Sequence, residues 1–580
     1  MATDAAPGSS WPFSTIVCLA LSISLLVRQL VSLWPYSGAG TPPMYGDYEA
    51  QRHWMEVTVN LPIGEWYRYD LPYWGLDYPP LTAYVSWACG TLSRFLDPPS
   101  MVLDSSRGYE TASHKTFMRL TVLTLDLFIY FPAAFILARR IWEPFPFHGL
   151  NTSQGKARQS KAESNVPLSS PTAGRVETSR FSATSGSCAI FALALLQPSL
   201  VLIDHGHFQY NSVCLGLAMG AAAAVLRGGK MGGVLGSILF SLSLNFKQMA
   251  LYYAPAFFFS LLAWCVSPAR GETRGGLHLT RQWFGALGRV LMLGVTVVAT
   301  FVCLWGPFCV YHHTSRTCDG STCLSSLGQI LARQFPFSRG LFEDKVANLW
   351  FCADVVFNIR QRLALPQLVK MALMATLCLV APVGVELMRP GKTLSPQRLV
   401  LALVNSSLAF FLCSFQVHEK SVLLPLCPLA FLWADSPMLV TWMQVVGAFS
   451  LWPLLCREGL GLPCIVSISL YVIASTVLTS LTGAGSAQRK TVGMVFPFTR
   501  FFTHSMAQWM VTISGLCMVG LFVAELTIQP PQLLPHLYPT LNAGFSCTNL
   551  VCAYVLCLYW QWVAADGSRG CGGVSREKQE

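Results

Sequence analysis

The sequence contains few charged residues for its length. Asp, Glu, Lys and Arg make up only 12% of its 580 residues, and 53% of the residues are hydrophobic, whereas about 25% of the residues of a soluble domain are charged. The mean hydropathy is +0.47. A chain this long and this apolar cannot hide its hydrophobic side chains in one aqueous core. This excludes a single soluble globular domain and leaves a lipid bilayer as the natural solvent.

The chain also lacks the patterns of a metal or redox site. Its 20 cysteines form no C-x-x-C pair and no Cys/His spacing typical of zinc, and many lie inside apolar runs, where cysteine acts as a small buried side chain. His205 and His207 form an H-x-H pair without an evident third ligand, which is a weak metal signal. We therefore expect no metal and no cofactor.

Two further absences concern targeting and nucleic acid. The first apolar run is not followed by a small-residue cleavage site, so we expect a membrane anchor rather than a signal peptide. The net charge is +11, but Lys and Arg lie mostly in short runs between apolar stretches, as they do in the cytosolic loops of membrane proteins. This distribution does not indicate a partner nucleic acid.

Apolar runs of spanning length recur along the whole chain. Ten clear runs cover residues 12–34, 117–139, 184–203, 286–310, 366–388, 398–416, 437–456, 460–482, 508–527 and 543–564. Shorter or interrupted runs lie near 79–96, 210–227, 231–246, 249–267 and 420–434. A helix needs about 20 apolar residues to cross a bilayer, so we expect an all-α membrane protein with about 14 transmembrane helices.

The Lys and Arg residues predict the orientation of these helices. Residues 148–185 are Ser-rich, lack periodicity and carry more basic than acidic residues, which predicts a disordered cytosolic insertion. Further basic clusters mark cytosolic turns at Arg227 with Lys230, at 270–281, at Arg389 with Lys392, and at Arg489 with Lys490. The parity of crossings then holds if the run near 79–96 is re-entrant or interfacial. Alternatively it spans, and one other short run does not.

This pattern predicts three regions. Residues 1–310 form an N-terminal membrane module that contains a first large loop at 35–78. Residues 311–365 form a second large loop, and residues 366–580 form a C-terminal membrane module with a short tail.

The first large loop carries the densest polar pattern. Residues 44–84 combine six carboxylates with Arg52, His53, Arg68 and many aromatic residues. Glu49 to Trp54 suits a short helix, with Asp47 as its N-cap. Tyr and Trp are typical of the membrane interface, and they also form surfaces on which sugar rings stack. The loop is either a substrate-binding element or an interfacial loop whose charges only solvate it.

Three other strings place polar groups at the ends of apolar runs. Residues 204–212 read DHGHFQYNS, which fits either a binding element or a polar helix end. Lys247 lies between two apolar runs, so it is either functional or extends to the interface. His418 and Lys420 directly follow a span, where they could bind a phosphate or anchor the helix end. Residues 339–348 predict a helix start in the second loop.

Seven strings occur in an order and spacing that resembles one enzyme family. They are GDYEAQRHWMEVT, YWGLDYPPLTAY, SRGYE, DHGHFQYNS, NFKQM, RGLFEDKVANLW and VHEKS. Together they resemble the dolichyl-phosphate-glucose-dependent glucosyltransferases of the endoplasmic reticulum membrane, multi-pass enzymes of the GT-C fold. The resemblance extends from about residue 44 to residue 424 and continues weakly beyond. GDYEAQRHW resembles the enzyme that adds the first glucose more than the sister that adds the second.

The resemblance implies a reaction and a site. Glucose would pass from dolichyl phosphate glucose to a nine-mannose oligosaccharide on dolichyl diphosphate, forming an α-1,3 linkage with inversion on the lumenal side. Asp47 would be the catalytic base, with Glu49 as the fallback. His418, Lys420, Arg339 and Lys247 would bind the donor phosphate. The predicted substrate-binding residues are Glu49, Arg52, His53, Trp54, Asp77, Tyr78, His207, Gln209 and Tyr210.

Alternatives and one covalent prediction remain. A transporter would explain the spans and the buried Lys247, but it would not need a loop rich in carboxylates and aromatics. The sister glucosyltransferase and a lipid-linked mannosyltransferase are the alternatives among enzymes. Cys318 and Cys323 bracket a turn-forming stretch in a loop that we place in the oxidising lumen, so we expect a disulfide between them.

Overall fold

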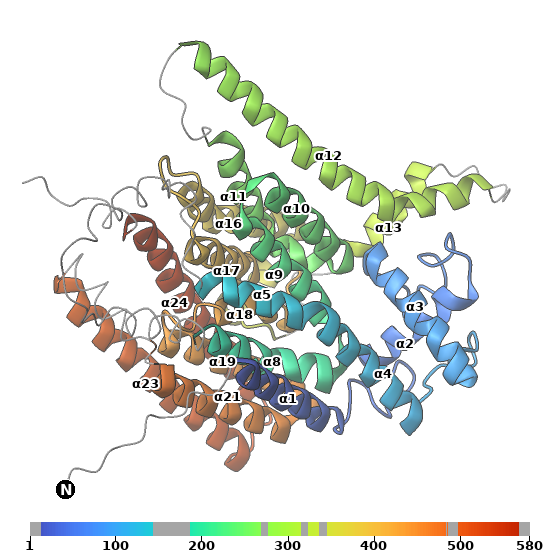
Figure 1. The fold of residues 1–580 in the computed structure, drawn as a ribbon. Helices are drawn as coiled ribbons and strands as arrows, with labels where there is room; N and C mark the ends of the chain where they lie inside the picture. The colour runs from blue at the N-terminus through green and yellow to red at the C-terminus, as the bar shows by residue number, and fades with distance from the viewer. Residues whose placement is uncertain are drawn as a thin grey trace, which may run out of the picture.

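All regular structure in the described part of the chain is helical, as expected (Figure 1). The computed structural model describes residues 13–142, 186–267, 276–314, 323–335, 345–482, 484 and 497–567. The predicted insertion at 148–185 and the predicted phosphate ligand Arg339 lie outside these residues, as does Cys318.

Ten helical segments of the described chain are long and apolar enough to cross a membrane. They cover Ser14–Ser32, Ala112–Trp142, Gly186–Phe208, Gln248–Val266, Gln282–Cys309, Leu365–Leu387, Pro396–Cys413, Gly461–Thr482, Gln508–Thr527 and Leu537–Val563. Nine of the ten clear runs in the sequence correspond to one of these segments, and the short run near 249–267 supplies the tenth. The result confirms a multi-span membrane protein.

One clear run is broken into two helices. Residues 437–456 form α19 (Pro437–Ser450) and α20 (Trp452–Arg457) rather than a single span. Pro453 lacks the N–H that would continue the helical hydrogen bonding, so the first helix ends there. Together with α9 (Asn211–Arg227), α10 (Gly229–Phe246) and α18 (Leu423–Ala430), α19 is a shorter or less apolar helix beside the ten. By length and composition the described residues hold ten candidate spans, and α18, with eight residues, is too short to cross a bilayer.

The two predicted membrane modules share one continuous core. The N-terminal half supplies α1 (Phe13–Ser32), α5 (Phe131–Trp142), α8 (Pro198–Val201), α9, α10, η4 (Gln248–Tyr253) and α11 (Ala254–Val266). The C-terminal half supplies α16 (Leu365–Leu387), α17 (Pro396–Cys413), α18, α19, α21 (Gly461–Thr482), α23 (Pro497–Thr527) and α24 (Leu537–Gly567). Helix α17 is almost entirely buried, and it packs against both halves.

The two helices around the first large loop lie at one end of this bundle (Figure 1, right). Helix α2 (Gly46–Asn60) packs along α3 (Pro80–Leu96), and α3 also contacts α10 and α12 (Gly276–Thr314). Helix α3 is not among the ten long apolar segments, which fits the alternative that the run near 79–96 is interfacial. Helix α2 begins earlier and is longer than the predicted 49–54.

The second large loop is fastened to the same end by a disulfide. Cys309, near the end of α12, is bonded to Cys323, the first residue of α13 (Cys323–Gln334). The prediction that Cys318 pairs with Cys323 is therefore wrong. The prediction was based only on the turn between Cys318 and Cys323. Helix α13 packs on α12, and this packing brings the Cα atoms of Cys309 and Cys323 within 4.8 Å of each other.

A buried ion pair joins the first span to the bundle. Arg28 Nε in α1 donates to Asp126 Oδ2 at 2.6 Å, and both side chains are at most 1% exposed. Asp126 begins a short π-helical segment, η2 (Asp126–Tyr130). The same oxygen lies 2.9 Å from His205 Nε2, in the π-helical segment η3 (Leu202–Phe208). The pair thus fixes the turn that also carries His207.

We predict that Arg28→Leu destabilises the protein by roughly 3–5 kcal/mol, because it leaves Asp126 as an unpaired buried carboxylate. Thermal unfolding in detergent measures the effect. The double variant Arg28→Leu with Asp126→Leu removes both charges and should recover most of the stability. A single variant that melts at the wild-type temperature would show that the pair is not needed.

Candidate active site

The backbone crosses itself directly before Asp47. Gly38 and Gly46 both have positive φ, at 75° and 68°. A Cβ on Gly46 would lie 2.7 Å from the carbonyl carbon of Ser37 and 2.8 Å from Cα of Gly38, so only glycine fits this crossing. The crossing delivers Asp47 into the first turn of α2.

Asp47 is not the N-cap of this helix, contrary to expectation. Tyr45 occupies the N-cap position without a side-chain cap, and the Asp47 amide donates instead to Ser37 Oγ at 3.3 Å. The Asp47 carboxylate is therefore free to point away from its own helix. It faces residues from two other parts of the chain.

Three side chains donate to a single oxygen, Oδ2 of Asp47. His207, near the end of η3, donates from Nε2 at 2.8 Å. Gln209, the C-cap residue of η3, donates from Nε2 at 2.6 Å. Lys420 Nζ, from η5 (Glu419–Val422), donates as well and lies 3.2 Å from His207 Nε2. Asp47 and Lys420 remain 25% and 22% exposed, so a bound molecule can reach both.

Lys247 extends this cluster into the protein. It follows α10 and is 3% exposed. Its ammonium group donates to Gln209 Oε1 at 2.8 Å and to Asn211 Oδ1 at 2.6 Å, and it lies 4.9 Å from the centroid of the Tyr78 ring. The side chain points into the site and is buried, so the alternative that it extends to the membrane interface does not hold.

The charges around Asp47 keep it ionised. Burial alone would raise the pKa of Asp47, but the nearby Lys420 ammonium and the hydrogen bond from His207 hold it well below its usual range. Burial alone would lower the pKa of Lys420, but Asp47 raises it above its usual value. These two groups therefore form an ion pair at neutral pH.

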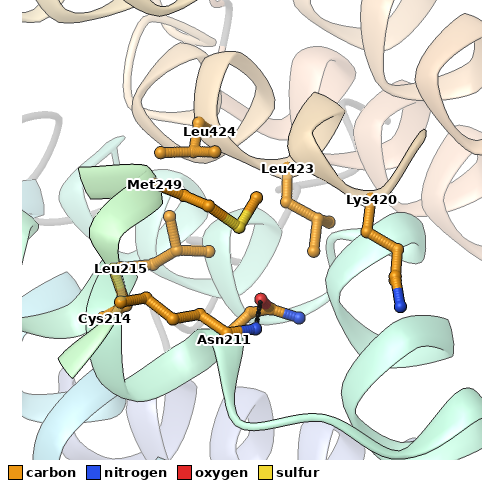
Figure 2. Close-up of a pocket in the computed structure, with 8 residues that line it drawn as sticks. Asn211, Cys214, Leu215, Met249, Lys420, Leu423 and Leu424 are labelled. Atoms are coloured by element: carbon orange, nitrogen blue, oxygen red, sulfur yellow. Dashed lines mark hydrogen bonds between the residues drawn. The ribbon is translucent and has the colours of Figure 1, made fainter. Parts of the chain in front are cut away.

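A pocket beside the cluster combines both lysines with an apolar wall. Its lining consists of Asn211, Cys214, Leu215, Lys247, Met249, Lys420, Leu423 and Leu424. Figure 2 shows the aliphatic and Met249 side chains gathered together, with the end of Lys420 apart from them. Two ammonium groups at the edge of an apolar pocket suit a molecule with an anionic head and an apolar chain.

Several predicted substrate-binding residues lie inside the first loop instead. Arg52 is fully buried and donates to Glu49 at 2.6 and 2.7 Å and to Glu56 at 2.7 Å. It also bonds Ser106 Oγ at 2.7 Å, in the SRGYE string. Burial alone would raise the pKa of Glu56, but His53 and Arg52 lower it to about 2. This network holds α2 to the loop that follows α3, and sugar contacts by these residues stay a prediction.

None of the remaining predicted residues is part of the pocket lining. Trp54 donates to the Trp74 carbonyl at 2.9 Å and packs on Tyr78, with ring centroids 4.9 Å apart. Tyr210 is buried, with its hydroxyl 2.7 Å from Thr121 Oγ1. Asp77 precedes Tyr78, whose hydroxyl lies 3.5 Å from Gln209 Oε1. His418 is the N-cap residue of η5, two residues before Lys420.

One residue of the cluster was missed from the sequence. Glu458 Oε2 lies 2.6 Å from His207 Nδ1. Glu458 follows α20 in the C-terminal half, outside all seven strings. Its only signal was an acidic residue next to a glycine at the end of an apolar run, which many helix ends share. Within the described residues no group of three His, Cys, Asp or Glu side chains is arranged to hold a metal ion.

Comparison with known proteins identifies the family. The sequence matches the ALG6, ALG8 glycosyltransferase family over residues 20–557. The chain belongs to this family. Its helices and its family make it a multi-pass membrane glycosyltransferase, which confirms the predicted enzyme class, and the family match decides against the transporter.

Relatives from distant organisms cover nearly the whole chain. The "Probable dolichyl pyrophosphate Man9GlcNAc2 alpha-1,3-glucosyltransferase" of Dictyostelium discoideum is 37% identical over 93% of this chain and 94% of its own length. The "Dolichyl pyrophosphate Man9GlcNAc2 alpha-1,3-glucosyltransferase" of Mus musculus is 37% identical over 93% and 95%. The Gallus gallus protein of the same name is 38% identical over 93% and 95%.

We predict that Lys420→Met changes the pH dependence of sugar transfer. In the wild type the pKa of Asp47 lies well below its usual range, so Asp47 stays ionised as the pH falls toward 5. Without Lys420 the burial of Asp47 raises its pKa, so the acid limb of kcat/KM moves to higher pH. The exposed Lys230→Met serves as the control. An acid limb that stays at the wild-type position would contradict this coupling.

Proposed function

We propose that this glycosyltransferase moves glucose from dolichyl phosphate glucose to the dolichyl-diphosphate-linked Man9GlcNAc2 oligosaccharide, forming an α-1,3 linkage with inversion on the lumenal side of the endoplasmic reticulum membrane. One observation carries the proposal: an ionised, accessible Asp47 lies against Lys420 at the edge of an apolar pocket. The names of the relatives support the acceptor and the linkage.

An inverting transfer needs few groups. In a single displacement the acceptor hydroxyl attacks the anomeric carbon from one face while the phosphate leaves from the other. A base must take the hydroxyl proton, and cations must stabilise the phosphate as its negative charge grows. Asp47 supplies the base, and Lys420 and Lys247 supply the cations. The acceptor oxygen forms a bond to the anomeric carbon as the bond from that carbon to the phosphate oxygen breaks. Dolichyl phosphate leaves with the bonding electrons, and the hydroxyl proton goes to Asp47.

Lys420 has two anionic partners in this scheme. In the structure it pairs with Asp47. The donor phosphate is a second anion at the same pocket, so it competes for Lys420 when it binds. As Lys420 turns to the phosphate, the pKa of Asp47 rises toward its usual range and Asp47 becomes a stronger base. Binding of the donor thus prepares the base for the acceptor.

The apolar side of the pocket is where we place the start of the donor's lipid chain. Leu215, Met249, Leu423 and Leu424 line it next to the two lysines. Dolichol lies in the bilayer, so its phosphate must enter at headgroup depth, where a residue directly after a span is located. Lys420 follows the span Pro396–Cys413 by a short connection. His418 and Arg339 are the further phosphate ligands that we propose.

Two features support the lumenal side. Disulfides form in the oxidising lumen and are rare in the cytosol, and Cys309–Cys323 fastens the second loop at the same end of the bundle as α2 and α3. The basic turn at Arg227 and Lys230, which the sequence predicts as cytosolic, joins α9 to α10. The other ends of these two helices carry Asn211 and lead to Lys247, so the turn lies at the helix ends away from the site.

The activity itself is tested with purified protein, labelled dolichyl phosphate glucose and two lipid-linked acceptors. The proposal expects glucose transfer to the nine-mannose oligosaccharide. It expects no transfer to the oligosaccharide that already carries one glucose, which the sister enzyme would use. Transfer to the second acceptor alone would replace our assignment by the sister activity.

We predict that Asp47→Asn lowers the rate of glucose transfer by roughly two to four decades, because asparagine keeps the shape of the side chain but cannot take a proton. Single-turnover assays at saturating donor and acceptor measure the chemical step. Asp104→Asn is the matched control, since Asp104 is an exposed carboxylate of the neighbouring loop that bonds Arg107. Wild-type turnover in Asp47→Asn would eliminate Asp47 as the base.

We predict that EDTA leaves the rate of transfer unchanged. Two ammonium groups already face the pocket where the phosphate would bind, and they would repel a divalent cation placed between them. The assay is repeated after chelation and after addition of Mg²⁺ or Mn²⁺. Loss of activity that one metal restores would contradict the role of the lysines and return attention to His205 and His207.

A further inference from the structure

A second carboxylate, Glu458 from the C-terminal half of the chain, is linked to the proposed base Asp47 through His207. Glu458 Oε2 lies 2.6 Å from Nδ1 of His207, and His207 Nε2 lies 2.8 Å from Oδ2 of Asp47. The side chains of Glu458 and His207 are 8% and 3% exposed, against 25% for Asp47. One imidazole ring therefore bridges an accessible carboxylate and a buried one.

The local fold fixes where Glu458 points. Glu458 caps the end of α20, and Gly459 follows with a φ of 74°. The Leu460 amide then donates to the Leu455 carbonyl at 2.7 Å, which closes the helix end in a Schellman-type turn. A glycine at this left-handed position lets the chain reverse directly after Glu458 and enter α21.

This helix end is seated against the turn that carries His207. A Cβ on Gly206 would lie 3.1 and 3.3 Å from the two terminal carbons of Leu460, so Leu460 packs directly on the backbone of η3. From the other side, Arg119 donates to the Gly206 carbonyl at 2.7 Å, and the Ser37 amide donates to the His207 carbonyl at 2.9 Å. The backbone of Gly206 and His207 is therefore held by one packing contact and two hydrogen bonds.

The ring itself is held by its two nitrogens. A carboxylate bonded to one nitrogen of a histidine fixes the orientation of the ring and the position of its proton. Glu458 does this at Nδ1, so Nε2 remains directed at Asp47. The cations that face this group are Lys420, 3.2 Å from Nε2, and Arg119, which bonds the preceding residue. A second carboxylate offsets part of the positive charge that they place around the ring.

We propose that Glu458 is a positioning residue for the transfer reaction: it holds His207 so that the ring in turn holds Asp47 in the orientation of a base. Glu458 touches neither sugar nor phosphate and acts only through His207. During the transfer the acceptor proton goes to Asp47, as in the proposed function on which this inference rests. When this proton neutralises Asp47, the carboxylate of Glu458 remains bonded to Nδ1 and still holds the His207 ring in place.

Three substitutions of Glu458 test separately whether its presence, its charge or its length is needed. Glu458→Ala removes the group, Glu458→Gln keeps an acceptor oxygen for Nδ1 but removes the charge, and Glu458→Asp keeps the charge on a shorter side chain. Glu525→Gln is the matched control, because Glu525 also holds α20, through Trp452 Nε1 at 2.9 Å, but has no contact with His207 among the described interactions. Each variant is purified in detergent, and its melting temperature is measured beside kcat, donor KM and the pH profile.

The inference expects a loss in turnover with unchanged donor affinity. Glu458→Ala should lower kcat by about ten- to a hundredfold, as loss of a carboxylate that orients a functional histidine does, at wild-type donor KM. Glu458→Gln should lower kcat less than Glu458→Ala, because its amide oxygen still accepts the hydrogen bond from Nδ1 but carries no charge. Glu458→Asp should recover part of the rate, and Glu525→Gln should retain it.

Other results would overturn the inference. Wild-type kcat in both Glu458→Ala and Glu458→Gln, in an enzyme that Asp47→Asn inactivates, removes Glu458 from the mechanism and leaves the proposed function standing. An equal loss in Glu525→Gln, with lowered melting temperatures throughout, assigns Glu458 to the packing of α20 alone. A wild-type protein that transfers no glucose overturns the proposed function and this inference together. The isosteric Glu458→Gln keeps the test valid if Glu458→Ala does not fold.

Discussion

One carboxylate oxygen connects segments that are far apart in the chain. Oδ2 of Asp47, at the start of α2, accepts hydrogen bonds from His207, Gln209 and Lys420. A charge near a bilayer is costly unless it is paired, so each of these groups depends on the others to remain where it is. The glycine crossing before α2, the π-helical end of the span 186–208 and the short helix η5 all serve this junction. The helix bundle positions these segments so that their side chains meet at Asp47.

The surrounding structure protects the junction without using the same residues. The ion pair of Arg28 and Asp126 fixes the turn before His207 from inside the membrane region. On the other side, the buried set of Glu49, Arg52 and Glu56 keeps α2 rigid. These buried groups bond one another and support the site, while Asp47 and Lys420 remain partly exposed, where a substrate can reach them. This division explains how a chain with so few charges can still build a polar site.

Much of this could be predicted from the sequence, since spans are long apolar runs and polar strings at their ends are rare enough to notice. The strings that contain Asp47, His207, Gln209, Lys247 and Lys420 were noticed in this way, their roles came from the resemblance to the family, and the structure brings the residues together. What failed depends on packing across long distances. Nothing local distinguishes Glu458 from any acidic helix end, and the partner of Cys323 is chosen by how α13 lies on α12. The burial of Arg52 could not be predicted, because nothing in the sequence indicates that its partners Glu49, Glu56 and Ser106 are buried as well.

A structure of the enzyme with dolichyl phosphate glucose, or with an analogue that cannot react, tests the central claim most directly. The account predicts that the phosphate lies within hydrogen-bond distance of Lys420 and next to Lys247. It also predicts that Lys420 has turned away from Asp47, and that Asp47 faces the anomeric carbon from the side opposite the phosphate. A donor whose phosphate lies elsewhere, with the ion pair between Asp47 and Lys420 unchanged, would contradict it.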